Sequence, residues 1–73
     1  MKLLNELTVG EEAVVIKMLK NNRRLRDLGL VEGTKIRCVL RSPLGDPAAY
    51  RIRGAVIAIR KEDAKNVRVI GNE

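Results

Sequence analysis

Apolar and polar residues alternate over several short stretches of this chain, which is the pattern of half-buried β-strands. The expected strands are residues 13–19, 34–41, 50–53, 55–60 and 67–69. The side chains expected to face a core are Val14, Ile16 and Met18 in the first strand and Ile36, Cys38 and Leu40 in the second. Five strands this short and this evenly spaced favour a small barrel, which leaves few exposed sheet edges.

One short α-helix is predicted at about residues 22–28, between the first two strands. Leu25 and Leu28 lie three residues apart, on one helical face, and Asn22 can cap the start. Gly29 suits the left-handed position that follows many helices. A helix of about two turns is unstable alone, so Leu25 and Leu28 are expected to dock it on the sheet.

Turns and loops are expected where glycine, proline and charged residues gather. Residues 42–47 contain two prolines and a glycine, which prevent regular strand pairing. Gly54 is expected to mark a bulge or bend, and residues 61–65 a charged turn with up to one turn of helix. The predicted fold is mainly β: a small five-stranded barrel with one short α-helix, in a single domain spanning residues 1–73.

The composition indicates a protein of a reducing cytoplasm. The chain has 73 residues and one cysteine, Cys38, so an intramolecular disulfide is excluded. No apolar run approaches the roughly 20 residues of a membrane span, and the first residues lack the apolar stretch of a signal peptide. We therefore expect a soluble cytoplasmic domain.

The residues that most often perform catalysis or bind metals are missing. The chain has no histidine, and its one serine, Ser42, has no histidine to activate it. Cys38 is expected to be a buried hydrophobe, and the adjacent pairs Glu11-Glu12 and Glu62-Asp63 to be solvated charges. We therefore expect no enzyme, no cofactor and no dedicated metal site.

The positive charge is concentrated in the middle of the chain. Residues 17–41 carry eight positive and two negative side chains, and this excess of six equals the net charge of +6 of the whole chain. Such a segment attracts acidic partners, whether a nucleic acid, an anionic membrane surface or an acidic protein. A small basic barrel that binds nucleic acid is the alternative function, although a chain with one aromatic residue offers little for bases to stack on.

Two motifs, in this order and spacing, resemble the FeoA family. The first is Leu25-x-x-Leu28-Gly29-Leu30-x-x-Gly33, and the second is Pro43-Leu44-Gly45-Asp46-Pro47. Leu4-x-x-Leu7-x-x-Gly10 before them and Val67-x-Val69 after them extend the resemblance over roughly residues 4–70.

The resemblance implies an SH3-like barrel and a small cytoplasmic accessory protein of bacterial ferrous iron uptake. Its implied partner is the cytoplasmic GTP-binding domain of the membrane iron transporter FeoB, which would hold it at the inner face of the membrane. The family is also described in general terms as binding transition metal ions, but the residues here do not support a site. No small-molecule substrate is implied, and weak self-association is left open.

We hypothesise that two regions contact that partner, one through charge and one through an apolar anchor. The residues are Arg23, Arg24 and Arg26 in the helix and Pro43, Leu44, Asp46 and Pro47 in the loop. The alternatives are an ordinary solvated helix face and a plain turn whose Leu44 folds back onto the barrel.

Overall fold

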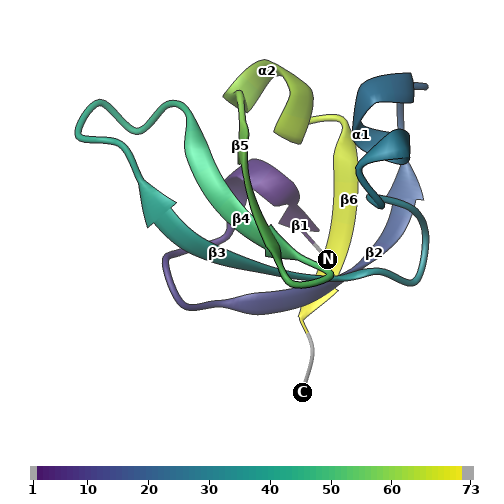
Figure 1. The fold of residues 1–73 in the computed structure, drawn as a ribbon, viewed down its shortest axis with the longest axis horizontal. Coiled ribbons are helices and arrows are strands. Elements are labelled where there is room, and N and C mark those ends of the chain that lie inside the picture. The colour runs from purple at the N-terminus through teal and green to yellow at the C-terminus, as the bar shows by residue number, and fades with distance from the viewer. Residues whose placement is uncertain (1, 72–73) are drawn as a thin grey trace.

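The computed structural model describes residues 2–71, which form one curled antiparallel sheet with short helices (Figure 1). The strands are β1 (Lys2–Leu3), β2 (Glu12–Met18), β3 (Lys35–Arg41), β4 (Ala48–Ile52), β5 (Ala55–Ile59) and β6 (Val67–Gly71). The helices are α1 (Arg23–Asp27), α2 (Lys61–Ala64) and the 3-10 helix η1 (Leu4–Glu6). The predicted mainly β class is confirmed, and the sixth strand is the two-residue β1, which pairs with β6.

The sheet order is β1-β6-β2-β3-β4-β5, and its curl encloses a core of aliphatic side chains around one aromatic ring. Tyr50 is 1% exposed, and its hydroxyl donates to the carbonyl oxygen of Leu4 at 3.5 Å. Cys38 is buried and free, as the strand alternation predicted. The other fully buried large side chains are Leu4, Leu7, Val15, Leu25, Leu30, Ile36, Ile52, Ile59, Val67 and Val69.

The predicted inward face of β2 is wrong. Ala13 and Val15 are buried, whereas Val14 and Ile16 are only half-buried and Met18 packs at the margin of the core. Residues 13–16 are apolar at every position, so alternation there gives no phase. A register shift between Val15 and Lys17 against β6 then changes the phase again.

Strand β3 follows the prediction as far as Cys38 and then departs from it. Ile36 and Cys38 are buried, but Leu40 is 63% exposed, so its predicted core position is wrong. The pairing with β4 is irregular between Cys38 and Leu40. An extra residue in one strand of a pair turns the following side chains to the other face.

Helix α1 is capped at both ends and anchored by one leucine. The Asn22 side chain accepts a hydrogen bond from the Leu25 N–H at 3.1 Å, and Leu25 is 1% exposed. At the other end Gly29, with φ +100°, lets the N–H of Leu30 reach the Leu25 carbonyl at 2.9 Å. Leu28 is 39% exposed, so its predicted docking role is wrong, and Leu30 is the second buried leucine.

The bend expected at Gly54 is a two-residue turn between β4 and β5. Arg53 and Gly54 both have positive φ, at 50° and 83°, which is the backbone of a tight hairpin turn. The Arg53 side chain passes close to Gly29, where an added Cβ would lie 3.0 Å from its Cδ. The hairpin turn is thus packed against the end of α1.

Replacing Leu25 by alanine should lower the free energy of unfolding by about 2–4 kcal/mol, as for other buried leucines. Leu28→Ala is the matched control on the same helix, and its cost should be below about 1 kcal/mol because that side chain is partly solvated. Urea unfolding followed by circular dichroism measures both. Equal losses in the two variants would show that α1 is not anchored as described.

A candidate partner-docking surface

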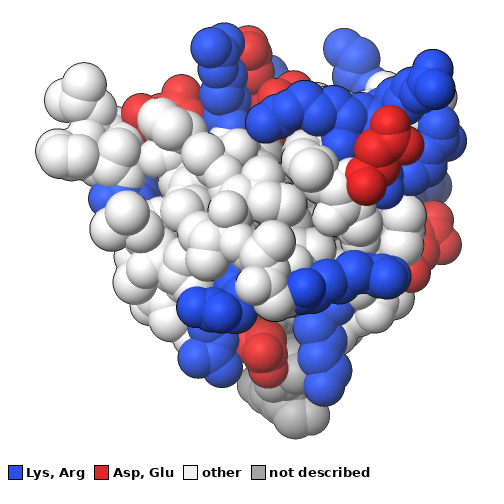
Figure 2. Space-filling model, in the orientation of Figure 1, with Lys and Arg blue, Asp and Glu red and all other residues white. Residues whose placement is uncertain are grey.

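The three helix arginines of the sequence hypothesis project into solvent. Arg23, Arg24 and Arg26 are all exposed, and the Arg23 guanidinium lies 3.8 Å from the Asp27 carboxylate in a well-solvated pair. Such a pair adds little stability and leaves the positive charge available to a partner. Lysine and arginine side chains gather on the upper right of Figure 2, at the end of the molecule where α1 lies in Figure 1.

The loop between β3 and β4 presents its leucine outward. Leu44 is 95% exposed, so the alternative in which it folds back onto the barrel is wrong. The loop is nonetheless ordered by main-chain bonds, from Gly45 N–H to Ser42 O at 2.8 Å and from Ser42 N–H to Pro47 O at 3.2 Å. Because hydrogen bonds already order this loop, its apolar side chain loses little conformational entropy when a partner covers it.

The Asp46 side chain makes a hydrogen bond within the domain. Its Oδ1 accepts the Lys61 N–H at 2.8 Å and so links the loop to the start of α2. Pro43 and Pro47 are exposed on either side. Among the loop residues of the hypothesis, Leu44 is therefore the apolar group best placed to contact a partner.

Arg41 supports the base of this loop, and the sequence hypothesis missed it. Its guanidinium donates to the carbonyl oxygen of Leu7 and, at 3.4 Å each, to those of Asn5 and Gly45. It therefore joins the loop to the N-terminal segment, about thirty-five residues earlier in the chain. Contacts between residues so far apart produce no recognisable pattern in the sequence around Arg41. The only sequence signal for Arg41 is a positive charge at the end of a predicted strand.

The structure brings the two predicted regions together only in part: Arg24 of the helix and Pro47 of the loop line one hollow of about 440 Å³. In Figure 1 the loop projects at the upper left and α1 lies at the upper right, with α2 between them. A partner that touched both would have to span this end of the molecule, α2 included.

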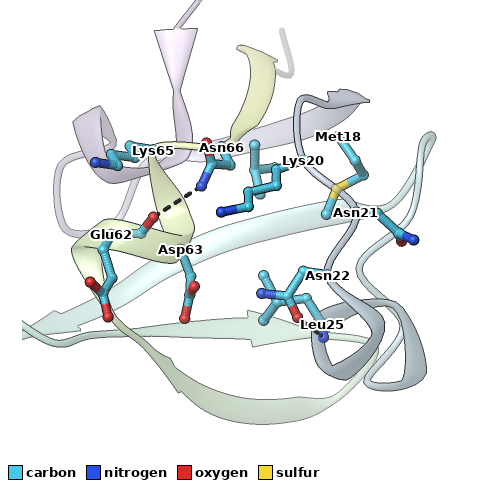
Figure 3. A pocket seen from close by; sticks show the side chains of 10 residues that line it. Met18, Lys20, Asn21, Asn22, Leu25, Glu62, Asp63, Lys65 and Asn66 are labelled. Atoms are coloured by element: carbon cyan, nitrogen blue, oxygen red, sulfur yellow. Dashed lines mark hydrogen bonds between the residues drawn. The ribbon is translucent and has the colours of Figure 1, made fainter.

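A hollow of about 600 Å³ lies between α1 and α2 (Figure 3). Its charged groups are Lys20 and Lys65 together with Glu62 and Asp63, and Leu25 and Met18 form its apolar part. The Asn66 side chain donates to the Glu62 carbonyl at 3.1 Å, as the dashed line marks. The lining of the hollow therefore combines both signs of charge with three asparagines.

Several carboxylates of the described residues lie in ion pairs. Glu11 lies 2.7 Å from Lys2, and Glu12 lies 3.6 Å from Arg37. Lys2 and the Thr8 N–H hold the pKa of Glu11 below its ordinary value.

Residues 2–71 contain no group of three or more His, Cys, Asp and Glu side chains that could hold a metal ion. No helix within the same residues is long and apolar enough to cross a membrane.

The FeoA domain family model matches residues 2–70. This chain belongs to the FeoA domain family. A relative from Porphyromonas gingivalis, a Fe(2+) transport protein A/Fe(2+) transporter FeoB fusion protein, is 35% identical over 69 residues. The match covers 90% of this chain and 8% of that protein, so this FeoA chain spans only a small part of its curated relative.

Two solved structures of FeoA proteins share the fold. The FeoA protein from Chlorobium tepidum is 35% identical with a TM-score of 0.87, over 94% of this chain and 69% of that one. The FeoA of Stenotrophomonas maltophilia, crystallised with zinc, is 32% identical with a TM-score of 0.83, over 96% and 91%. That protein is described as a procaryotic SH3 domain protein, which agrees with the SH3-like fold expected here.

Arg41→Ala should destabilise the protein by about 1–3 kcal/mol, because the carbonyl groups of Leu7 and Gly45 lose a charged donor. Amide exchange of Ser42 and Gly45, whose N–H groups hold the loop, should also become faster. Arg37→Ala is the control, since Arg37 lies on the same strand with a half-exposed side chain, and its cost should be within about 0.5 kcal/mol. Unchanged exchange in the loop would show that Arg41 does not support it.

We expect no tight Fe²⁺ or Zn²⁺ site in the monomer, because the chain has no histidine and Cys38 is buried. Calorimetric titration of the purified protein with each ion should give only weak, non-stoichiometric heats. A stoichiometric site of submicromolar affinity that is lost in Cys38→Ser would contradict this expectation.

Proposed function

We propose that this FeoA protein is a non-enzymatic cytoplasmic accessory factor of ferrous iron uptake. It acts by binding the cytoplasmic GTP-binding part of a FeoB transporter, and this contact holds it at the inner face of the membrane. The observation that carries the proposal is the Porphyromonas gingivalis relative, in which FeoA and FeoB are parts of one chain. Covalent fusion gives two domains a high effective concentration, which is useful when they act together.

The exposed groups of this chain suit such a contact. The arginines of α1 accelerate encounter with an acidic surface, since long-range attraction raises the association rate. Leu44 supplies the apolar anchor that slows dissociation, because it is 95% exposed on a loop that main-chain hydrogen bonds hold in place. The contacts therefore divide between charge and apolar burial, as the sequence hypothesis proposed.

The alternative, binding of single-stranded nucleic acid, finds less support. Such proteins stack bases on exposed aromatic rings. The one aromatic residue of this chain, Tyr50, is 1% exposed and lies in the core. The positive charge alone would give weak, non-specific binding that salt abolishes.

Binding to the purified cytoplasmic domain of a FeoB transporter tests the proposal. Leu44→Ala should raise the dissociation constant about tenfold at any salt concentration, as expected for an apolar anchor. The triple variant Arg23→Ser, Arg24→Ser, Arg26→Ser should mainly slow association, with an effect that fades at high salt. Lys35→Ser is the control, an exposed cation on β3 that belongs to neither proposed region.

Wild-type binding by both variants, with the fold intact, would rule out the proposed surface. A loss confined to the arginine variant would leave the arginines as steering groups and place the anchor elsewhere. No binding by the wild-type protein, with and without GTP, would contradict the proposed function itself.

A further inference from the structure

Strand β5 ends the sheet, and one of its edges has no partner among residues 2–71. A two-residue turn closes between Ile52 and Ala55, so the hydrogen-bonded pairs with β4 involve Ala55, Ile57 and Ile59. The main-chain N–H and C=O groups of Val56 and Ala58 therefore point away from β4. Within the described residues they make no other main-chain hydrogen bond.

This edge is also apolar and exposed. The strand Ala55-Val56-Ile57-Ala58-Ile59 contains no charged residue, and Val56 is 54% exposed. Figure 2 shows an area without charged groups across the middle of the face that β5 occupies in Figure 1. Proteins usually protect such edges with charges, prolines or a covering element, because an open edge pairs readily with another strand.

The surroundings of the edge favour an acidic partner. Residues 47–61 contain four arginine and lysine side chains, Arg51, Arg53, Arg60 and Lys61, and no carboxylate. A hollow of about 290 Å³ beside the β4–β5 turn is lined by Lys35, Arg37, Arg51 and Arg53, with Glu12 as its one carboxylate. Arg37 and Arg51 are direct cross-strand partners, and the Glu12 carboxylate, 3.6 Å from Arg37, offsets only part of this positive charge.

At the other end of β5, near Ile59, positive and negative side chains are more nearly balanced. A hollow of about 440 Å³ there is lined by Arg24 and Arg60 and also by Glu62 and Asp63. The Arg60 guanidinium lies 3.8 Å from Glu62. The positive potential is therefore strongest at the turn end, where Arg53 precedes the strand.

The same charges disfavour a second copy of this chain on the edge. A parallel pair of β5 strands would bring the two Arg53 ends together. An antiparallel pair would bring the Arg53 end of each beside the Arg60-Lys61 end of the other, where Glu62 and Asp63 offset part of the positive charge. Like charges placed in this way act against self-pairing. A foreign segment that carries carboxylates at one end meets no such penalty.

We propose that the β5 edge binds an extended acidic segment of another protein by β-strand addition. The main chain of the segment pairs with Val56 and Ala58, and its carboxylates lie toward Arg51 and Arg53. This mode obtains affinity from main-chain hydrogen bonds and selectivity from the flanking side chains. It requires neither Leu44 nor Arg23, so it can be tested apart from the transporter-docking surface proposed above, which adjoins it where Arg24 and Pro47 line the hollow beside Ala58.

The test uses isotope-labelled protein and a probe peptide, acetyl-Asp-Asp-Val-Thr-Val-Thr-Val-amide, observed by nuclear magnetic resonance. The amide signals of Val56 and Ala58 should shift on titration, and their hydrogen exchange should slow. A peptide with Lys-Lys in place of Asp-Asp should bind about tenfold more weakly at low salt. Methylation of the main-chain nitrogens of the peptide that would face β5 should abolish binding.

Five variants assign the contacts. Val56→Pro removes the outward N–H without removing a bond to β4 and should abolish binding, whereas Val56→Thr keeps the N–H and should bind normally. Arg53→Asn keeps a residue suited to positive φ but removes the charge, so the preference for the acidic peptide should fall several-fold. Arg23→Gln and Leu44→Ala should bind the peptide as wild type does.

Several results would overturn the proposal. They are unchanged β5 signals at millimolar peptide, equal affinity for the acidic and lysine peptides, and normal binding by Val56→Pro. A dimer formed through β5 in the absence of peptide would show that a second copy is the occupant. Displacement of the peptide by an RNA oligonucleotide but not by an acidic protein would assign the edge to nucleic acid.

Discussion

The burial of Leu25 is the contact on which helix α1 and its exposed arginines depend. A five-residue helix is unstable in water, so α1 exists only because Leu25 enters the core and both helix ends are capped. Gly29 then closes the helix, and the Arg53 side chain packs beside it. One apolar contact thus holds the helix that carries the arginines, and the end of that helix lies against the Arg53 side chain of the turn before β5.

Local signals in the sequence predicted the elements well, because each depends on residues close together in the chain. Asn22 before the helix, Gly29 after it and the two prolines of the loop all act on their own backbone. The phase of β2 and the position of Leu40 were not predictable in this way. Both depend on irregular pairing with β6 and β4, which joins residues far apart in sequence.

The candidate surfaces were predictable to different degrees for the same reason. Charge clustering pointed to the arginines of α1, and the prolines pointed to the loop, although neither signal could show that Leu44 stays exposed. Arg41 was missed because its acceptors in the N-terminal segment are distant in the chain. The open edge of β5 was missed because strand order, and not the composition of the strand, decides which edge remains unpaired.

The two surfaces meet at Pro47. This residue ends the loop that carries Leu44, and it also lines the hollow beside Ala58 of β5. The bond from Lys61 N–H to Asp46 Oδ1 ties the same loop to the helix that follows β5. A partner that moved the loop would therefore also shift the α2 end of the β5 edge. The two links are Pro47, which lies beside Ala58, and the hydrogen bond between Lys61 and Asp46. A small domain can in this way couple two binding events, because each surface shares covalent and hydrogen-bonded neighbours with the other.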